Sequence, residues 1–142
     1  MSFFLDPAFE ATTAALAELP SGGAACHGDL HPDNVVLTAR GPVVLDWPEL
    51  SAGHPLADVA RTSLMLRIAS PADGRLGLAL RAGRRLLHAA YLRRYLKLTG
   101  RRAEELAPFL LPVAGARYAY LIDDERRALL AILERLGGEA RR

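Results

Sequence analysis

The chain has 142 residues, of which 51% are hydrophobic and 24% are charged, a composition that predicts one globular domain and excludes disorder. Eighteen Lys and Arg residues against sixteen Asp and Glu residues give a net charge of +2, which makes a nucleic-acid partner unexpected. The single cysteine, Cys26, excludes an internal disulfide, and no apolar run approaches the ~18 residues of a membrane span. We therefore predict a cytoplasmic protein with no membrane contact.

The first predicted element is a helix that begins at Asp6-Pro7, a capping carboxylate followed by proline, and ends at Pro20-Ser21-Gly22-Gly23. Two short β-branched runs follow, Val35-Val36-Leu37 and Val43-Val44-Leu45, and the five residues between them predict a hairpin turn. Because both runs are apolar throughout, we expect helices to cover both faces of this hairpin.

The rest of the chain has a helical pattern. The first helix after the hairpin carries these residues on one face: Leu56, Val59, Ala60, Ser63 and Leu64. A break at Pro71-Ala72-Asp73-Gly74 precedes a long helix to about Thr99-Gly100, then a segment with Pro108 and Pro112, then one or two helices to Gly137-Gly138. Strands near one end and several helices after them predict a mainly helical α+β fold.

The residues whose side chains could take part in catalysis or metal binding lie between Cys26 and Asn34 and at Asp46-Trp47. Protein kinases use H-R-D-L-x-x-x-N for a catalytic base and a metal-binding Asn, and a second metal-binding Asp opens their D-F-G motif. Four residues match the first pattern position for position: His27, Asp29, Leu30 and Asn34. Asp46-Trp47 stands where the second motif would be, and we expect Trp47 to pack in the core behind Asp46.

The hairpin links the two motifs. If it folds about Arg40, Val35 lies opposite Leu45 and Asn34 lies opposite Asp46. Opposed Cα atoms of an antiparallel pair are roughly 4.5–5.5 Å apart. A Mg²⁺ bound at about 2.0–2.1 Å from each side-chain oxygen then fits between Asn34 and Asp46. The sequence therefore predicts a metal site carried by the hairpin.

The stretch from Cys26 to Arg61 resembles the catalytic lobe of the aminoglycoside phosphotransferase family, relatives of the protein kinases. The pattern of that family is H-G-D-x-H-x-x-N, then a hairpin, then D-W, then D-P-x-x-D-hydrophobic-A. Residues 27–34, 46–47 and 55–60 correspond to its three parts. The resemblance implies a protein-kinase-like C-terminal lobe that transfers a phosphoryl group from ATP, with Mg²⁺, to a hydroxyl of a small molecule.

The resemblance also implies roles for individual residues. Asp29 and His27 are the catalytic residues, with Asp29 as the base that accepts the proton of the attacking hydroxyl. Asn34 and Asp46 bind Mg²⁺ and, through it, the cofactor ATP.

Two further residues, Asp58 and His31, give structural support, with Asp58 bracing the catalytic loop from the next helix. The sequence departs from the family at Gly53-His54-Pro55, where Gly-Asp-Pro is usual, and at Pro48-Glu49, where an acidic residue usually comes first.

The motifs by which a kinase-like enzyme binds ATP in its N-terminal lobe are not found in the sequence. The chain has no G-x-G-x-x-G, and its only lysine, Lys97, follows the catalytic motifs. We therefore expect residues 1–142 to be one domain, the catalytic lobe, with the N-terminal nucleotide-binding lobe on another chain or lost from the gene. The isolated chain is expected to be inactive, and to bind that lobe or to self-associate through the surface the lobe would cover.

Other interpretations stay open. His27, Asp29 and His31 at positions i, i+2 and i+4 would line one face of a strand, as the ligands of a hydrolytic metal site can, although Gly28 and Pro32 disfavour a regular strand. The chain is alternatively a non-catalytic remnant or binding module that keeps the kinase-like lobe.

A basic stretch follows the motifs. Between Gly74 and Ala103 there are nine cations and no acidic residue. This pattern is typical of a solvated helix face, or of a surface for an anionic substrate or partner. A polycationic aminoglycoside fits poorly beside either, so we do not carry over the substrate after which the family is named.

Overall fold

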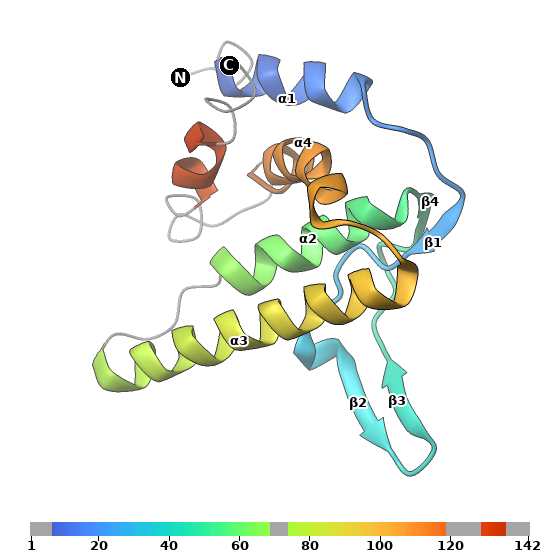
Figure 1. Cartoon of the computed structure of the whole chain (residues 1–142), viewed down its shortest axis with the longest axis vertical. Helices are drawn as coiled ribbons and strands as arrows, with labels where there is room; N and C mark the ends of the chain where they lie inside the picture. The colour runs from blue at the N-terminus through green and yellow to red at the C-terminus, as the bar shows by residue number, and fades with distance from the viewer. Residues whose placement is uncertain (1–6, 69–73, 119–128, 136–142) are drawn as a thin grey trace.

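The computed structural model describes residues 7–68, 74–118 and 129–135 (Figure 1). In chain order its elements are α1 (Pro7–Ala17), β1 (Ala24–Cys26), a 3-10 turn (Pro32–Asn34), β2 (Val35–Thr38), β3 (Gly41–Val44), β4 (Ser51–Gly53), α2 (Pro55–Ile68), α3 (Gly74–Thr99), a second 3-10 turn (Ala103–Leu106) and α4 (Ala107–Tyr118). Residues 129–135 are also helical. Two small antiparallel sheets accompany the helices, so the predicted mainly helical α+β class is confirmed.

Helix α2 is the centre of the packing. Its predicted apolar face is buried, with Leu56 1% exposed and Leu64 fully buried. The first half of the helix packs on Phe109, and the second half packs on Leu111 and Leu129. Because burying a leucine side chain contributes roughly 1.5–3 kcal/mol, this helix and its neighbours stabilise the whole described part of the chain.

Helices α3 and α4 pack against α2, and α1 packs on α4. Figure 1 shows α3 running along α2, and α1 lying across α4 on the opposite side. At the crossing of α1 and α4, a Cβ added to Gly115 would lie only 2.9 Å from the Cβ of Thr12, so the close approach requires glycine there. As predicted, α1 begins at Pro7 and α3 ends at Thr99. The predicted break at residues 71–74 lies mostly outside the described residues.

The β2–β3 hairpin is present, but its predicted register is wrong by one residue. Val35 pairs with Val44 and not with Leu45. The Leu45 N–H donates to the carbonyl oxygen of Asn34 at 2.9 Å, which places Asn34 opposite Leu45. Asp46 therefore lies one residue beyond the position that the predicted metal site required.

The turn explains the register. It contains two residues, Ala39-Arg40, and not three centred on Arg40. The Thr38 hydroxyl accepts a hydrogen bond from the Arg40 N–H at 3.2 Å and donates to the Gly41 carbonyl at 2.8 Å, which closes this tight turn. Gly41 adopts a φ of 109°, a conformation that glycine reaches without steric cost.

The expectation that helices cover both faces of the hairpin is wrong within the described residues. Leu37 is 83% exposed, and Val36 and Val43 are each more than two-fifths exposed. Figure 1 shows the hairpin projecting away from the helices, so its turn lies far from them. Strand β2 adjoins the helices across a cavity of about 360 Å³, which Val35 and Leu37 help to line from the strand and Tyr91 from α3.

A second sheet pairs β1 with β4, and the sequence did not predict it. Its strands are three residues each, Ala-Ala-Cys and Ser-Ala-Gly, and such small residues have little β-propensity. A Cβ added to Gly53 would lie 3.2 Å from the Cys26 sulfur, so small residues let the two strands meet. This sheet joins the start of the loop that carries His27 and Asp29 to the start of α2.

Candidate active site

One carboxylate on α2 holds the loop that follows β1. The Asp58 carboxylate accepts a hydrogen bond from the His27 N–H at 2.9 Å with one oxygen and from the Gly28 N–H at 2.7 Å with the other. Hydrogen bonds to an ionised carboxylate are shorter and stronger than neutral ones. Asp58 therefore has the contacts that the bracing role requires.

Gly28 allows the loop to turn at this point. Its φ is 80°, in the region that residues with a Cβ rarely adopt. A Cβ at this position would also lie 2.8 Å from the Cβ of Glu49, so the loop and the segment after β3 pack in direct contact. The glycine of the motif is thus required both by backbone conformation and by space.

The ring of His27 forms its hydrogen bonds with the backbone. Its Nδ1 accepts a hydrogen bond from the Asp29 N–H at 3.2 Å, so its Nε2 carries the proton and donates to the Leu45 carbonyl at 2.9 Å. The ring is 3% exposed and lies 4.5 Å from the ring of Trp47. With both nitrogens bonded to the backbone, His27 ties the loop that follows β1 to the end of the hairpin.

Trp47 is not in the core. It is 45% exposed, and its indole N–H donates to the Val44 carbonyl at 3.0 Å. The prediction of core packing behind Asp46 is therefore wrong, although the indole contacts the ring of His27.

Asn34 and Asp29 are joined through the loop. The Asn34 side-chain N–H donates to the Asp29 carbonyl at 2.9 Å, so the amide oxygen of this buried residue is oriented away from that bond. The Asp29 carboxylate is 33% exposed and lies 3.6 Å from Nε2 of His31. The nitrogen Nδ1 of His31 lies 3.7 Å from the Asp33 carboxylate on its other side. Asp29 is thus held through its backbone and accessible at its side chain.

Asp46 has a left-handed backbone, with φ of 58°. Such a conformation costs a residue other than glycine on the order of 1–3 kcal/mol, and functional sites are where it is usually tolerated. Asp46 directly follows Leu45, whose N–H binds Asn34 and whose carbonyl accepts from His27. The backbone therefore ties the residue before Asp46 to Asn34 and His27, in spite of the shifted register.

The donor set at this place is an amide oxygen and a carboxylate. Mg²⁺ prefers such hard oxygen ligands, and it commonly takes only one or two from protein and the rest from water and phosphates. Asn34 and Asp46 fit that ion. No cluster of three or more His, Cys, Asp or Glu residues able to hold a metal occurs within residues 7–68, 74–118 and 129–135.

The alternative of a hydrolytic metal site on a strand is overturned. Strand β1 ends at Cys26, so His27, Asp29 and His31 follow it in a loop and do not line one strand face. Both nitrogens of His27 are already bonded to the backbone. These three residues therefore cannot act together as a ligand set in this conformation.

A cavity of about 370 Å³ opens beside Asp29. We call it the Asp29 cavity, and it is lined by Asp29, Glu49, Arg61 and Arg117. The Arg61 guanidinium forms an ion pair with the Glu49 carboxylate. Sequence reasoning assigned no site role to the last three. Arg61 was recognisable, since it follows Asp58 by three residues and shares its helix face, whereas Arg117 comes from α4 and gave no local signal.

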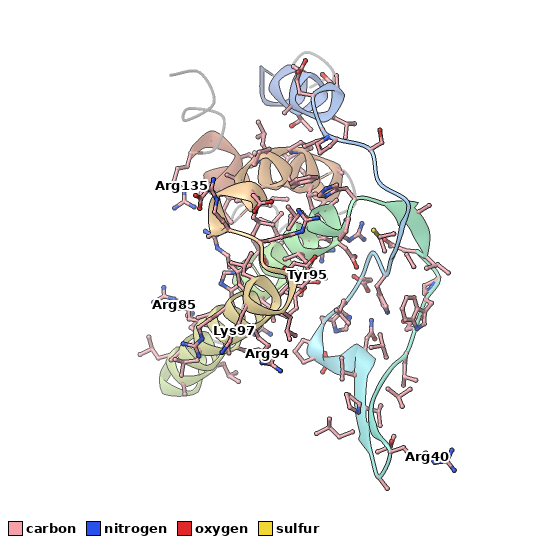
Figure 2. All side chains as sticks on the ribbon, turned by 45° about the vertical axis from the view of Figure 1, so that its right-hand side comes forward. Arg40, Arg85, Arg94, Tyr95, Lys97 and Arg135 are labelled. Carbon is pink, nitrogen blue, oxygen red and sulfur yellow. The ribbon has the colours of Figure 1, made fainter. Side chains whose placement is uncertain are left out.

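The basic stretch lies mostly on α3. Figure 2 shows Arg85, Arg94 and Lys97 projecting from that helix, and all three are exposed. Arg101, in the segment after α3, pairs with Glu105 at 3.2 Å. In the part of the chain that the structure describes, no helix is both long and apolar enough for a membrane span.

Comparison with known families gives one match. Residues 4–109 match the phosphotransferase enzyme family, a region that includes the catalytic loop, the hairpin, α2 and α3. The chain matches no curated protein and no solved structure. The family match confirms the resemblance that the motifs between Cys26 and Arg61 carry.

Proposed function

Because the chain belongs to the phosphotransferase enzyme family, we propose that it transfers the terminal phosphoryl group of ATP to a hydroxyl of a small molecule. The observation that carries this proposal is the brace between α2 and the catalytic loop. Asp58 fixes the loop by two short hydrogen bonds, and the accessible carboxylate of Asp29 lines an open cavity. A base that must meet a bound hydroxyl needs both features.

Asp29 is the proposed base. It accepts the proton of the acceptor hydroxyl while the hydroxyl oxygen forms a bond to the terminal phosphorus. The bond from that phosphorus to the bridging oxygen breaks, and ADP leaves with the electron pair. His31, 3.6 Å from the Asp29 carboxylate, helps to orient it.

Asn34 and Asp46 are the proposed ligands of Mg²⁺. When bound, the ion neutralises charge on the phosphates. The hydrogen bond from the Asn34 side chain to the Asp29 carbonyl links the ligand to the base, so the spacing between the two sites is set within one loop. The proposed location of the protein is the cytoplasm, where ATP is available.

The proposal includes a nucleotide-binding lobe outside these 142 residues. The sequence contains no glycine-rich phosphate loop and no lysine before Lys97. The exposed apolar side chains of the hairpin, together with Trp47, provide the surface that such a lobe would cover. Without that lobe, ATP would be held from one side only, so we expect little turnover by this chain alone and a tendency to self-associate.

The test is transfer from ATP with Mg²⁺ to a panel of hydroxyl acceptors, with and without an N-terminal lobe supplied from a relative. In the lobe-complete form, Asp29→Asn should lower kcat strongly with little change in the KM for ATP, because the base acts on the acceptor proton. Glu18→Gln, an exposed acid after α1, is the matched control. A mutant Asp29→Asn with full kcat would remove Asp29 from its role, and robust transfer by the chain alone would contradict the need for a second lobe.

A further inference from the structure

The basic stretch has no role in the proposed reaction, and it divides the chain into two parts of opposite charge. The residues from Gly74 to Ala103 carry nine of the eighteen cations and no acid. The other residues carry the remaining nine cations and all sixteen acids, which gives them a net charge of −7 against +9 for the stretch. Such an asymmetry favours contact between the basic part of one molecule and the acidic part of another.

The outer surface of α3 is both basic and apolar. Leu86, Arg93 and Lys97 follow one another at spacings of seven and four residues, which places them on one face of the helix. All three are exposed, and Leu86 is 72% exposed. Figure 2 shows Arg94 and Lys97 projecting from the helix, and neither forms an ion pair with another residue in the described part of the chain. These two cations are therefore free to pair with a second molecule.

An acidic and apolar surface lies on the other side of the molecule, on residues 33–47, which we call the hairpin surface. The side chain of Asp33 is 96% exposed, with Nδ1 of His31 at 3.7 Å from its carboxylate. Asp46 is also exposed, and it has no ion pair within residues 7–68, 74–118 and 129–135. The hairpin between these two acids carries exposed apolar side chains, among them Leu37 at 83% exposed. The hairpin surface is thus apolar like the outer surface of α3 but opposite to it in charge.

Within one chain the two surfaces do not cover each other. Helix α3 packs on α2, whereas the hairpin projects away from the helices (Figure 1). The two flank the cavity of about 360 Å³ at one end and diverge from there. Arg40, the cation of the hairpin surface, lies at the turn, away from Asp33 and Asp46 (Figure 2). Both surfaces are therefore open to a second molecule.

We propose that this second molecule is another copy of the chain, and that α3 of each copy docks on the hairpin surface of the other. The cations of α3 then face Asp33 and Asp46, and Leu86 contacts the apolar side chains of the hairpin. Because each copy offers both surfaces, a two-fold axis makes the contact twice and closes the dimer. The apolar area supplies most of the free energy, while the ion pairs select the orientation, since exposed ion pairs contribute little on their own.

This inference goes beyond the proposed transfer reaction and does not depend on it. The N-terminal lobe that the proposed function requires would cover the same hairpin, so the lobe and the second copy exclude each other. The dimer is therefore the form that the chain adopts without that lobe. We expect it to be weak and to dissociate at low protein concentration, because its ion pairs are exposed to water.

The test is sedimentation velocity of the 142-residue chain over a range of protein concentrations, without ATP or Mg²⁺. We expect an equilibrium between monomer and dimer. Its dissociation constant should rise by about tenfold or more between about 50 mM and about 500 mM salt, because salt screens exposed charges. A purely apolar dimer would not weaken in this way.

Charge reversal identifies the two surfaces. Arg94→Glu on α3 and Asp33→Arg on the hairpin surface should each weaken the dimer by about tenfold or more, since each places like charges face to face. An equal mixture of the two variants should restore the affinity of the parent, because the reversed α3 then faces the reversed hairpin and the two unchanged surfaces face each other. Arg135→Glu and Glu18→Lys, which reverse exposed charges on other elements, are the matched controls (Figure 2). Circular dichroism checks the fold of each variant, and Lys97→Glu replaces Arg94→Glu if the latter does not fold.

Four results would overturn the inference: a monomer at every concentration, a dimer that either charge reversal leaves unchanged, a mixture that binds no more tightly than the single variants, or an equal loss in the controls. A chain that is monomeric alone, and whose hairpin resonances shift when an N-terminal lobe from a relative is added, would also overturn it by assigning the hairpin surface to that lobe. These measurements involve no phosphoryl transfer, so failure of the dimer leaves the proposed function standing. Absence of transfer in the lobe-complete form would likewise leave the dimer standing.

Discussion

The two sides of the candidate active site differ in what supports them. The loop with Asp29 is bonded to Asp58 on α2, between side chains such as Leu56 that are almost fully buried. The side with Asp46 continues from a two-stranded hairpin on which Leu37 is 83% exposed. Two strands alone are marginal in water, so little besides the loop contacts fixes this second side.

This contrast concerns the two requirements of the proposed reaction, a positioned base and a positioned metal ligand. The position of Asp29, the proposed base, depends on the loop that Asp58 of the packed helix α2 holds. The position of Asp46, the proposed metal ligand, depends on the bonds of Leu45 to Asn34 and His27. We therefore expect the base side to be the stable half and the metal side to be the half that a ligand or a second lobe completes.

The largest expected effect tests whether the helices alone carry the stability. Leu64→Ala removes a fully buried side chain on α2 and should lower the free energy of unfolding by about 2–5 kcal/mol, because it leaves a cavity in the core. Leu37→Ala, the same substitution on the exposed hairpin, should change it by less than about 0.5 kcal/mol. Urea denaturation measures both. A large cost for Leu37→Ala would mean that the hairpin is covered in solution, and its dependence on protein concentration would identify self-association.

The next effect concerns the brace itself. Asp58→Asn keeps the shape of the side chain but has one acceptor oxygen, so either the His27 or the Gly28 N–H loses its partner. We expect a loss of about 1–3 kcal/mol in the free energy of unfolding. We also expect faster hydrogen exchange at these two amides. Glu104→Gln, an exposed acid at the second 3-10 turn, is the control, and unchanged exchange in Asp58→Asn would show that the loop does not depend on α2.

The difference between the two sides also decides how much the sequence could predict. Helix α2 and its buried face, Leu56 to Leu64, could be predicted from the sequence. The helical spacing of the apolar residues places them together on one face of a helix only. The hairpin was predicted but its register was not, because strands that are apolar throughout fit equally well after a shift of one residue. The motif around Asp29 was visible since its residues are close in sequence. Arg117 was not, because only tertiary packing brings α4 to the catalytic loop.

A smaller effect is expected at the metal side. Asp46→Ala should remove the weak binding of Mg²⁺ or Mn²⁺ that we predict for the isolated chain, because it leaves Asn34 as a single neutral ligand. Calorimetry gives the affinity, and Mn²⁺ broadening of the Asn34 resonances gives the place. Glu18→Ala should bind as the parent does. Equal metal binding by Asp46→Ala and the parent would rule out Asp46 as a ligand. The hairpin would then have no proposed role in metal binding.

The smallest effect lies where the two sides meet. Tyr91 of α3 helps to line the cavity at the base of β2, and burial raises the pKa of its hydroxyl to about 12. Between pH 10 and 12 the unfolded chain releases this proton while the folded chain keeps it, so the free energy of unfolding falls as the pH rises. Tyr91→Phe should flatten this fall, whereas Tyr118→Phe is the control. Burial also raises the pKa of Tyr95, which is present in both variants, so the difference between them isolates Tyr91. An identical pH dependence in Tyr91→Phe and the parent would mean that water reaches Tyr91 at the base of the hairpin. The solvent-exposed part of the hairpin side would then reach closer to α2 than it does in the structure.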